Sequence, residues 1–207
     1  MAQRTFTVPT VRAVLARQTR RAAALDRAAL VAARTHLHNA GAERWIAAYS
    51  RLGEHAACWL ALGGGGALLD RQPKHRPRWL RGVGIVLAAY GLNYAVKVIV
   101  HRRRPELPGL PPLTATVSSL SFPSAHATTS FAAARAFTGL VPATGVYAPA
   151  VAFAVTRPYL GVHYPSDVIA GALLGTAIAG AWPQPSRHRS AARPNATDAP
   201  AAARQRP

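Results

Sequence analysis

The chain has 207 residues, which suits a single domain, and it combines a half-hydrophobic composition with a formal net charge of +18. Its basic residues crowd beside apolar stretches instead of spreading over the whole chain. This distribution is typical of membrane segments, so we expect a membrane protein without a nucleic-acid partner, the alternative being a soluble basic domain.

The N-terminal part is basic, and we expect residues 1–21 to be flexible. No apolar core of the kind that a cleavable signal peptide requires is found there. Over residues 22–38 apolar residues recur at helical spacing with charged residues between them. This pattern predicts an amphipathic helix that lies in the membrane interface.

Five apolar stretches could then cross a membrane, although several fall short of the ~20 residues of a full span. They cover residues 45–69, 79–100, 123–140, 143–157 and 166–183. They are rich in Ala and Gly, and Gly171 and Gly175 form a small-xxx-small pair that favours close helix packing. The sequence therefore predicts an all-α, polytopic helical bundle with about five transmembrane helices, in the cell membrane.

Residues 22–183 would form the membrane-embedded domain. The remaining residues, 184–207, are rich in Pro, Ala and Arg and read as a disordered basic tail.

Three places interrupt the apolar pattern, and the first is "KVIVHRRRP". Lys97 and Arg104 are seven residues apart and share a helical face, and Pro105 favours a helix end near Arg104. Arg102 and Arg103 fit ordinary snorkelling to lipid headgroups. Lys97 lies inside an apolar run, where an ionisable residue indicates function.

The second place is "SFPSAHATTS". Pro123 suits the first position of a helix, which would put Ser124, Ala125 and His126 in the first turn. Backbone N–H groups there lack partners within the helix and can bind an anion. A histidine at a helix start is otherwise unremarkable.

The third place is "TRPYLGVHYPSDVIAG", where Pro165 again indicates a helix start. Asp167 falls in the first turn, and its plain interpretation is a helix cap. His163, however, lies four residues earlier, and a carboxylate beside a histidine can orient the ring and raise its basicity.

Together these residues indicate phosphate chemistry. Lys97, Arg104 and Arg157 supply positive charge, and one histidine could attack phosphorus while the other protonates the departing oxygen. Two predicted helices separate the second and third places, so all three fall on one membrane face.

The same residues resemble the type-2 phosphatidic acid phosphatase superfamily, which carries K-x6-R-P, P-S-G-H and S-R-x5-H-x3-D in that order. The matching segments are "KVIVHRRRP" (97–105), "PSAH" (123–126) and "TRPYLGVHYPSD" (156–167), within a resemblance that covers roughly residues 45–183. There are two departures: Ala125 replaces the usual Gly, and Thr156 replaces the usual Ser.

The resemblance implies a role for each matching residue. His163 would be the nucleophile that forms a phosphohistidine, Asp167 would orient it, and His126 would protonate the leaving alcohol and then activate water. The substrate phosphate would be held by Lys97, Arg104, Ser124, Ala125 and Arg157. No metal or other cofactor is expected.

A finer likeness, in "LPGLPPLTATVSSLSFPSAHATTSFAAARAF" and "YLGVHYPSDVIAGALLG", is to actinobacterial decaprenylphosphoryl-phosphoribose phosphatases. It implies a polyprenyl-linked phosphomonoester as substrate, in arabinan synthesis for the cell wall. Two alternatives stay open: a phosphatase for polyprenyl diphosphate or phosphatidate, and a catalytically silent membrane scaffold. Arg135 lies about 20° from Ser124 around a helix at ~100° per residue, so it could face the site, although snorkelling or a structural ion pair is its plainer interpretation.

Overall fold

The computed structural model describes residues 11–183, and within them the regular secondary structure is entirely helical, as expected. The helices, in chain order, are α1 (Val11–His36), α2 (Ala40–Leu52), α3 (Ala57–Leu69), α4 (Arg76–Val100), α5 (Ala125–Phe137), α6 (Ala143–Tyr159) and α7 (Pro165–Ala181). Two short 3₁₀ turns, η1 (Glu54–Ala56) and η2 (Pro73–His75), precede α3 and α4. Residues 1–10 and 184–207 lie outside the described part. They comprise the first ten residues of the predicted flexible segment 1–21 and the whole of the predicted tail.

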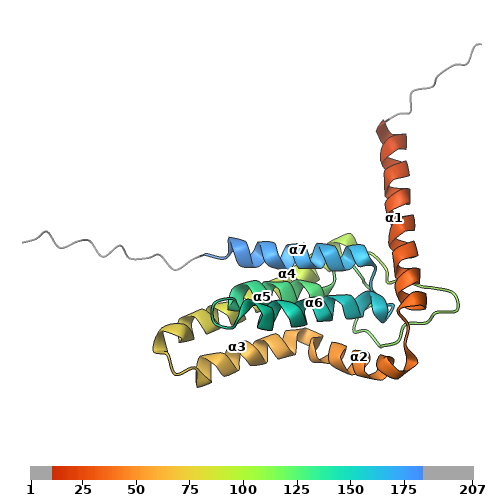
Figure 1. The fold of residues 1–207 in the computed structure, drawn as a ribbon. Helices are drawn as coiled ribbons and strands as arrows, with labels where there is room; N and C mark the ends of the chain where they lie inside the picture. Colours follow the sequence, from red (N-terminus) through yellow and green to blue (C-terminus); the bar gives the residue numbers. More distant parts are fainter. Residues whose placement is uncertain (1–10, 184–207) are drawn as a thin grey trace, which may run out of the picture.

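The N-terminal helix is longer than the sequence pattern suggested. It begins at Val11, so the predicted flexible segment 1–21 and the helix α1 overlap over eleven residues. Figure 1 shows α1 running across one end of the bundle, whereas α3 to α7 lie along each other. Helix α1 therefore does not lie alongside the helices of the bundle.

The first predicted span, 45–69, is not one helix. It is divided into α2 and α3 at residues 53–56, where His55 and Ala56 adopt left-handed backbone conformations with φ of 52° and 60°. A left-handed residue ends an α-helix, so two in succession turn the chain. The polar first third of this segment therefore becomes a separate helix beside the end of the bundle (Figure 1).

One described helix is long and apolar enough to cross a membrane alone: Pro73–Val100, which comprises η2 and α4, contains an 18-residue stretch with a mean hydropathy of 1.8. Helix α7 is apolar but shorter, and α3 and α5 have 13 residues each. Large apolar side chains point outward from several helices, among them Leu87, Ile99, Val155, Ile169 and Leu173. Such exposed apolar surface is expected of helices that face lipid.

Helix α5 lies at the centre of the bundle, and nine of its 13 residues are buried. It packs most closely against α7, as the predicted small-xxx-small pair requires. A Cβ atom added at Gly171 would lie 2.6 Å from the carbonyl oxygen of Ser124, and one at Gly175 would lie 2.0 Å from that of Thr128. The two glycines therefore let the backbones of α5 and α7 touch.

Candidate active site

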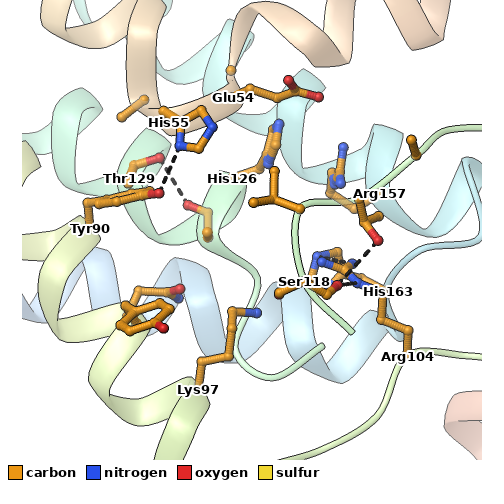
Figure 2. A pocket seen from close by; sticks show the side chains of 18 residues that line it. Glu54, His55, Tyr90, Lys97, Arg104, Ser118, His126, Thr129, Arg157 and His163 are labelled. Carbon is orange, nitrogen blue, oxygen red and sulfur yellow. Dashed lines mark hydrogen bonds between the residues drawn. The ribbon is translucent and has the colours of Figure 1, made fainter. Parts of the chain in front are cut away.

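A cavity of about 130 Å³ lies at one end of the bundle, where α4 and α6 end and α5 begins. Its wall includes six of the eight residues predicted for the site: Lys97, Arg104, Ala125, His126, Arg157 and His163. Figure 2 shows the cationic side chains and both histidines around this space. The three predicted places, far apart in sequence, thus meet at one end of the bundle.

The first cluster comes from the end of α4 and the loop after it. Lys97 is buried, and its Nζ donates to the carbonyl oxygen of Leu120 at 3.0 Å. Arg104 donates from Nε to Ser118 O and from Nη1 to Val162 O, each at 2.7 Å. Each cation therefore keeps N–H groups free of protein acceptors beside the cavity.

The nucleophile candidate, His163, follows α6 and is 2% exposed. Its Nε2 lies 3.1 Å from Nη1 of Arg104, and because a guanidinium only donates, Nε2 is the acceptor. The neutral ring then carries its proton on Nδ1. Burial, followed by the charges of Arg104, Arg157 and Lys97, holds the pKa of His163 well below its usual range. The ring is accordingly neutral, with a lone pair on the cavity side.

Asp167 stands behind this histidine at the third position of α7. Its Oδ2 accepts from the backbone N–H of Tyr164 at 2.9 Å and lies 3.6 Å from Nδ1 of His163. That separation is too long for a hydrogen bond, and Nδ1 has no other partner. The carboxylate therefore acts as a helix cap and also faces the histidine, which unites the two interpretations of its position.

The second cluster begins α5 two residues later than the sequence suggested. Pro123 precedes the helix, and Ser124 is its N-cap, with Oγ accepting from the N–H of Ala127 at 3.5 Å. Ser124 is fully buried and does not line the cavity. Ala125 does line it, so the backbone of the first turn, more than the Ser124 hydroxyl, faces the space.

His126 lies in that first turn, and its Nε2 donates to the carbonyl oxygen of Ser50 at 2.9 Å. Nδ1 is then the nitrogen that remains for proton exchange. Ser50 also accepts a short hydrogen bond on its Oγ from Nη1 of Arg157, whose Nε is buried without a partner. Ser50, at the end of α2, thus supports one predicted acid and one predicted phosphate ligand.

The cavity wall holds three cations, Lys97, Arg104 and Arg157, against one carboxylate, Glu54. Buried charges in proteins are normally balanced by partners. The positive excess therefore favours an anion as the natural occupant, and a phosphomonoester at neutral pH carries close to two negative charges.

Two further sequence interpretations have a definite outcome. Arg135 does not face the site: it is exposed at the other end of α5, beside Arg81 and Gly180. The angular argument neglected the rise of ~1.5 Å per residue, which separates Arg135 from Ser124 along the helix axis. Arg102 is not a simple snorkelling residue, because it forms ion pairs with Asp26 and Asp167.

Several residues that shape the site were missed by sequence reasoning, among them Asp26, Glu54, His55, Tyr90 and Ser50. Asp26 left one usable signal, since it is one of only seven acids in the chain. The others have no local pattern that marks them.

Comparison with known proteins agrees with this geometry. Residues 79–189, more than half of the chain, match the PAP2 superfamily. The chain belongs to the PAP2 superfamily. It is a phosphatase with the fold of a membrane protein: it resembles the structure of a transmembrane PAP2-type phosphatidylglycerolphosphate phosphatase from Bacillus subtilis, with a TM-score of 0.60 and 23% identity over 77% of this chain and 83% of that one.

Sequence relatives are closer. A protein named decaprenylphosphoryl-5-phosphoribose phosphatase from Mycolicibacterium smegmatis is 46% identical over 128 residues, which are 60% of this chain and 68% of the relative. Its namesake from Mycobacterium tuberculosis is 40% identical over 132 residues, 62% of this chain and 72% of the relative. The predicted superfamily and the finer likeness are both confirmed, and this PAP2 chain is a membrane lipid phosphatase.

Proposed function

We propose that this PAP2 phosphatase hydrolyses the 5-phosphate of a polyprenyl-linked phosphoribose, such as decaprenylphosphoryl-5-phosphoribose, in the synthesis of arabinan for the cell wall. The observation that supports it most is the cavity whose wall holds both predicted histidines, His126 and His163, with three cations, at one end of a bundle whose helices expose large apolar side chains. The names of the two mycobacterial relatives support the choice of lipid.

In the proposed reaction, the phosphate enters among Lys97, Arg104 and Arg157 and takes the place that Arg104 holds at Nε2 of His163. Nε2 then attacks phosphorus and the ester P–O bond breaks. His126, which takes up a proton at Nδ1 when the anionic phosphate binds, gives that proton to the departing sugar oxygen. Asp167 stabilises the positive charge that develops on the ring. The products of this half are the free sugar hydroxyl and a phosphohistidine.

Water completes the cycle. Deprotonated His126 accepts a proton from the water as it attacks phosphorus, the P–N bond breaks, and inorganic phosphate leaves. His163 regains its lone pair and His126 its proton, so the protein is unchanged. None of these steps requires a metal or another cofactor.

We propose the membrane arrangement on the same basis. Residues 22–183 would form the embedded phosphatase domain of a multi-pass cell-membrane protein, with α3 to α7 as about five spans and α1 in the interface. The outward-facing apolar side chains of α4, α6 and α7 support this arrangement. Labelling single cysteines at Leu87, Ile99, Val155 and Leu173 from the aqueous phase tests it, because protection by lipid is expected at all four.

The decisive test of the reaction is His163→Ala in purified protein without added metal. We expect phosphate release from a polyprenyl phosphoribose phosphate to be abolished, and labelled substrate to leave no phosphorylated protein. His101→Ala is the matched control, since His101 is exposed and lies outside the cavity. Wild-type activity in His163→Ala would overturn the mechanism.

The substrate is tested separately with wild-type protein on a panel of lipids. We expect the highest kcat/KM for the phosphoribose lipid, ahead of polyprenyl diphosphate and phosphatidate. A preference for either of the latter would leave the phosphatase intact and replace the substrate. No phosphate release from any lipid would instead favour a silent scaffold.

A further inference from the structure

A buried carboxylate on α1 reaches the active-site end of the bundle. Asp26 is 9% exposed, and its Oδ2 pairs with Nη2 of Arg102 at 2.7 Å. Its oxygens also accept hydrogen bonds from the backbone N–H and the hydroxyl of Ser166, at 2.9 and 2.5 Å. Asp26 thus links α1 to the first turn of α7 and to the loop after α4.

Arg102 connects this carboxylate to the catalytic one. Its Nη1 donates to Oδ1 of Asp167 at 2.8 Å, and its guanidinium lies 4.0 Å from the centre of the Tyr164 ring. Oδ2 of Asp167 is left to face His163. One arginine thus bridges two carboxylates and fixes which oxygen of Asp167 points to the nucleophile.

Both members of the outer ion pair are charged. Burial would raise the pKa of Asp26, but hydrogen bonds from Ser166 and Arg102 outweigh it and hold the pKa below its usual value. Burial likewise would lower the pKa of Arg102, but its hydrogen bond to Asp26 and the charge of Asp167 raise it.

The charge of Asp26 has an electrostatic consequence. Without Asp26, the positive charge of Arg102 would offset the negative charge of Asp167. Asp167 would then stabilise a positively charged His163 less strongly. Asp26 neutralises the arginine, so Asp167 can hold its orientation without losing its effect on the histidine. A buried ion pair that loses one partner leaves an uncompensated charge, which is costly.

Helix α1 is seated so that this contact is maintained. Among its described side chains only Asp26, Leu30 and Arg34 are buried, and they recur every four residues on one face. Arg34 donates to the carbonyl oxygens of Tyr159 and Pro111, at 3.1 and 2.8 Å. Helix α1 is therefore anchored on both sides of Leu30, and it precedes the matched residues 79–189.

We propose that Asp26 is a positioning residue for the phosphatase reaction, acting through Arg102 on Asp167, so that the interfacial helix α1 is part of the active site. The inference rests on the proposed roles of Asp167 and His163. It adds a residue from outside the matched family region to the catalytic arrangement.

Asp26→Asn tests the proposal because it keeps the shape of the side chain and removes its charge. We expect kcat to fall about tenfold, which corresponds to a change of one unit in the pKa of Asp167. KM should stay within about twofold, because the phosphate ligands are untouched. Asp26→Glu should recover part of the lost kcat. Wild-type kcat in Asp26→Asn, or a change confined to KM, would overturn the proposal.

A double-mutant cycle identifies the route. Arg102→Gln should lower kcat by itself, and adding Asp26→Asn to it should have little further effect, because the charge that Asp26 neutralises is already gone. Multiplying effects would show that Asp26 does not act through Arg102, contrary to the proposal.

Two variants separate this role from helix docking. Arg27→Gln, on the exposed face of α1, should match the wild type. Leu30→Ala removes apolar packing one turn away and should lower the melting temperature while the kcat of the folded protein stays near wild type. A loss of kcat in Leu30→Ala equal to that in Asp26→Asn would attribute the effect to docking alone.

His163→Ala distinguishes a failure of the proposed function from a failure of this inference. Activity in that variant refutes the proposed function, whereas an inactive His163→Ala with a fully active Asp26→Asn refutes only this inference.

Discussion

Replacing Gly175 by alanine should disturb the fold and the active site together. Its Cβ would lie 2.0 Å from the carbonyl oxygen of Thr128, whereas ordinary contact begins at about 3.4 Å, so α5 and α7 would have to separate by about 1.4 Å. Overpacking of this kind costs about 1–3 kcal/mol, and a backbone contact cannot be relieved by a rotamer change. We expect the melting temperature to fall by roughly 2–12 °C.

Activity should fall as well, because Thr128 lies half a turn beyond His126 on α5. A displacement of ~1 Å at a catalytic group can reduce the rate about 100-fold. Gly91→Ala is the matched control: it is also a helical glycine, but a Cβ there meets nothing within 4 Å. It should gain up to ~1 kcal/mol of stability from helix propensity. Melting in detergent and phosphate release measure both effects, and a Gly175→Ala protein as stable and active as Gly91→Ala would refute the reasoning.

Three further variants give distinct outcomes. Arg157→Lys keeps the charge but loses the planar guanidinium, and kcat/KM for the phosphoribose lipid should fall at least about tenfold; an unchanged value would exclude Arg157 as a phosphate ligand. Ala125→Gly removes the methyl group from the cavity wall, so activity should be retained while stability falls by at most ~1 kcal/mol, as thermal melting would show. Hydrogen bonds from Trp79, Gln72 and His75 hold the pKa of Asp70 at about 2, below its ordinary 3.8. The stability that this carboxylate contributes is therefore present above pH 3.8 and is lost as the pH falls towards 2. Asp70→Asn should therefore make the melting temperature less dependent on pH between 3.8 and 2, and leave activity at neutral pH unchanged. A dependence on pH as steep as that of the wild type would contradict the lowered pKa of Asp70.

The sequence predicted those parts of the site that depend on local spacing. The place of Asp167 in the first turn of α7 followed from Pro165, and the close packing at Gly171 and Gly175 followed from their spacing, although the sequence did not name α5 as the partner helix. The break at His55 and Ala56 could not be predicted, because alanine rarely adopts the left-handed region and histidine, although enriched there, adopts it too seldom to indicate a break.

Contacts between distant segments were also beyond sequence reasoning. Asp26 and Arg102 are 76 residues apart, and only the crossing of α1 over the end of the bundle brings them together. Ser50 supports His126 because the chain turns at the end of α2. Arg135 shows the opposite case, in which an angular relation on one helix was correct but the position along its axis was not.

The same turn that interrupted the predicted first span, residues 53–56, forms part of the cavity wall. His55 lines the cavity, and its Nδ1 lies 2.9 Å from the hydroxyl of Tyr90, so these two side chains form a polar pair away from the three cations (Figure 2). A substrate whose phosphate is held by those cations would extend its next group along this wall. For a phosphoribose lipid that group is a sugar with hydroxyls, and for phosphatidate it is a glycerol ester without them.

The two kinds of lipid should therefore respond differently to His55→Ala. Loss of one hydrogen bond, worth about 0.5–1.5 kcal/mol, should raise KM for the phosphoribose lipid about two- to tenfold and leave KM for phosphatidate nearly unchanged. The kcat values should change little, because the proposed nucleophile His163 and the proposed phosphate ligands are intact. Tyr90→Phe, which removes only the hydroxyl, should reproduce a part of the effect. An equal rise in KM for both lipids would show that His55 and Tyr90 shape the cavity without binding the sugar hydroxyls. This wall of the cavity would then give no support to the choice of a phosphoribose substrate.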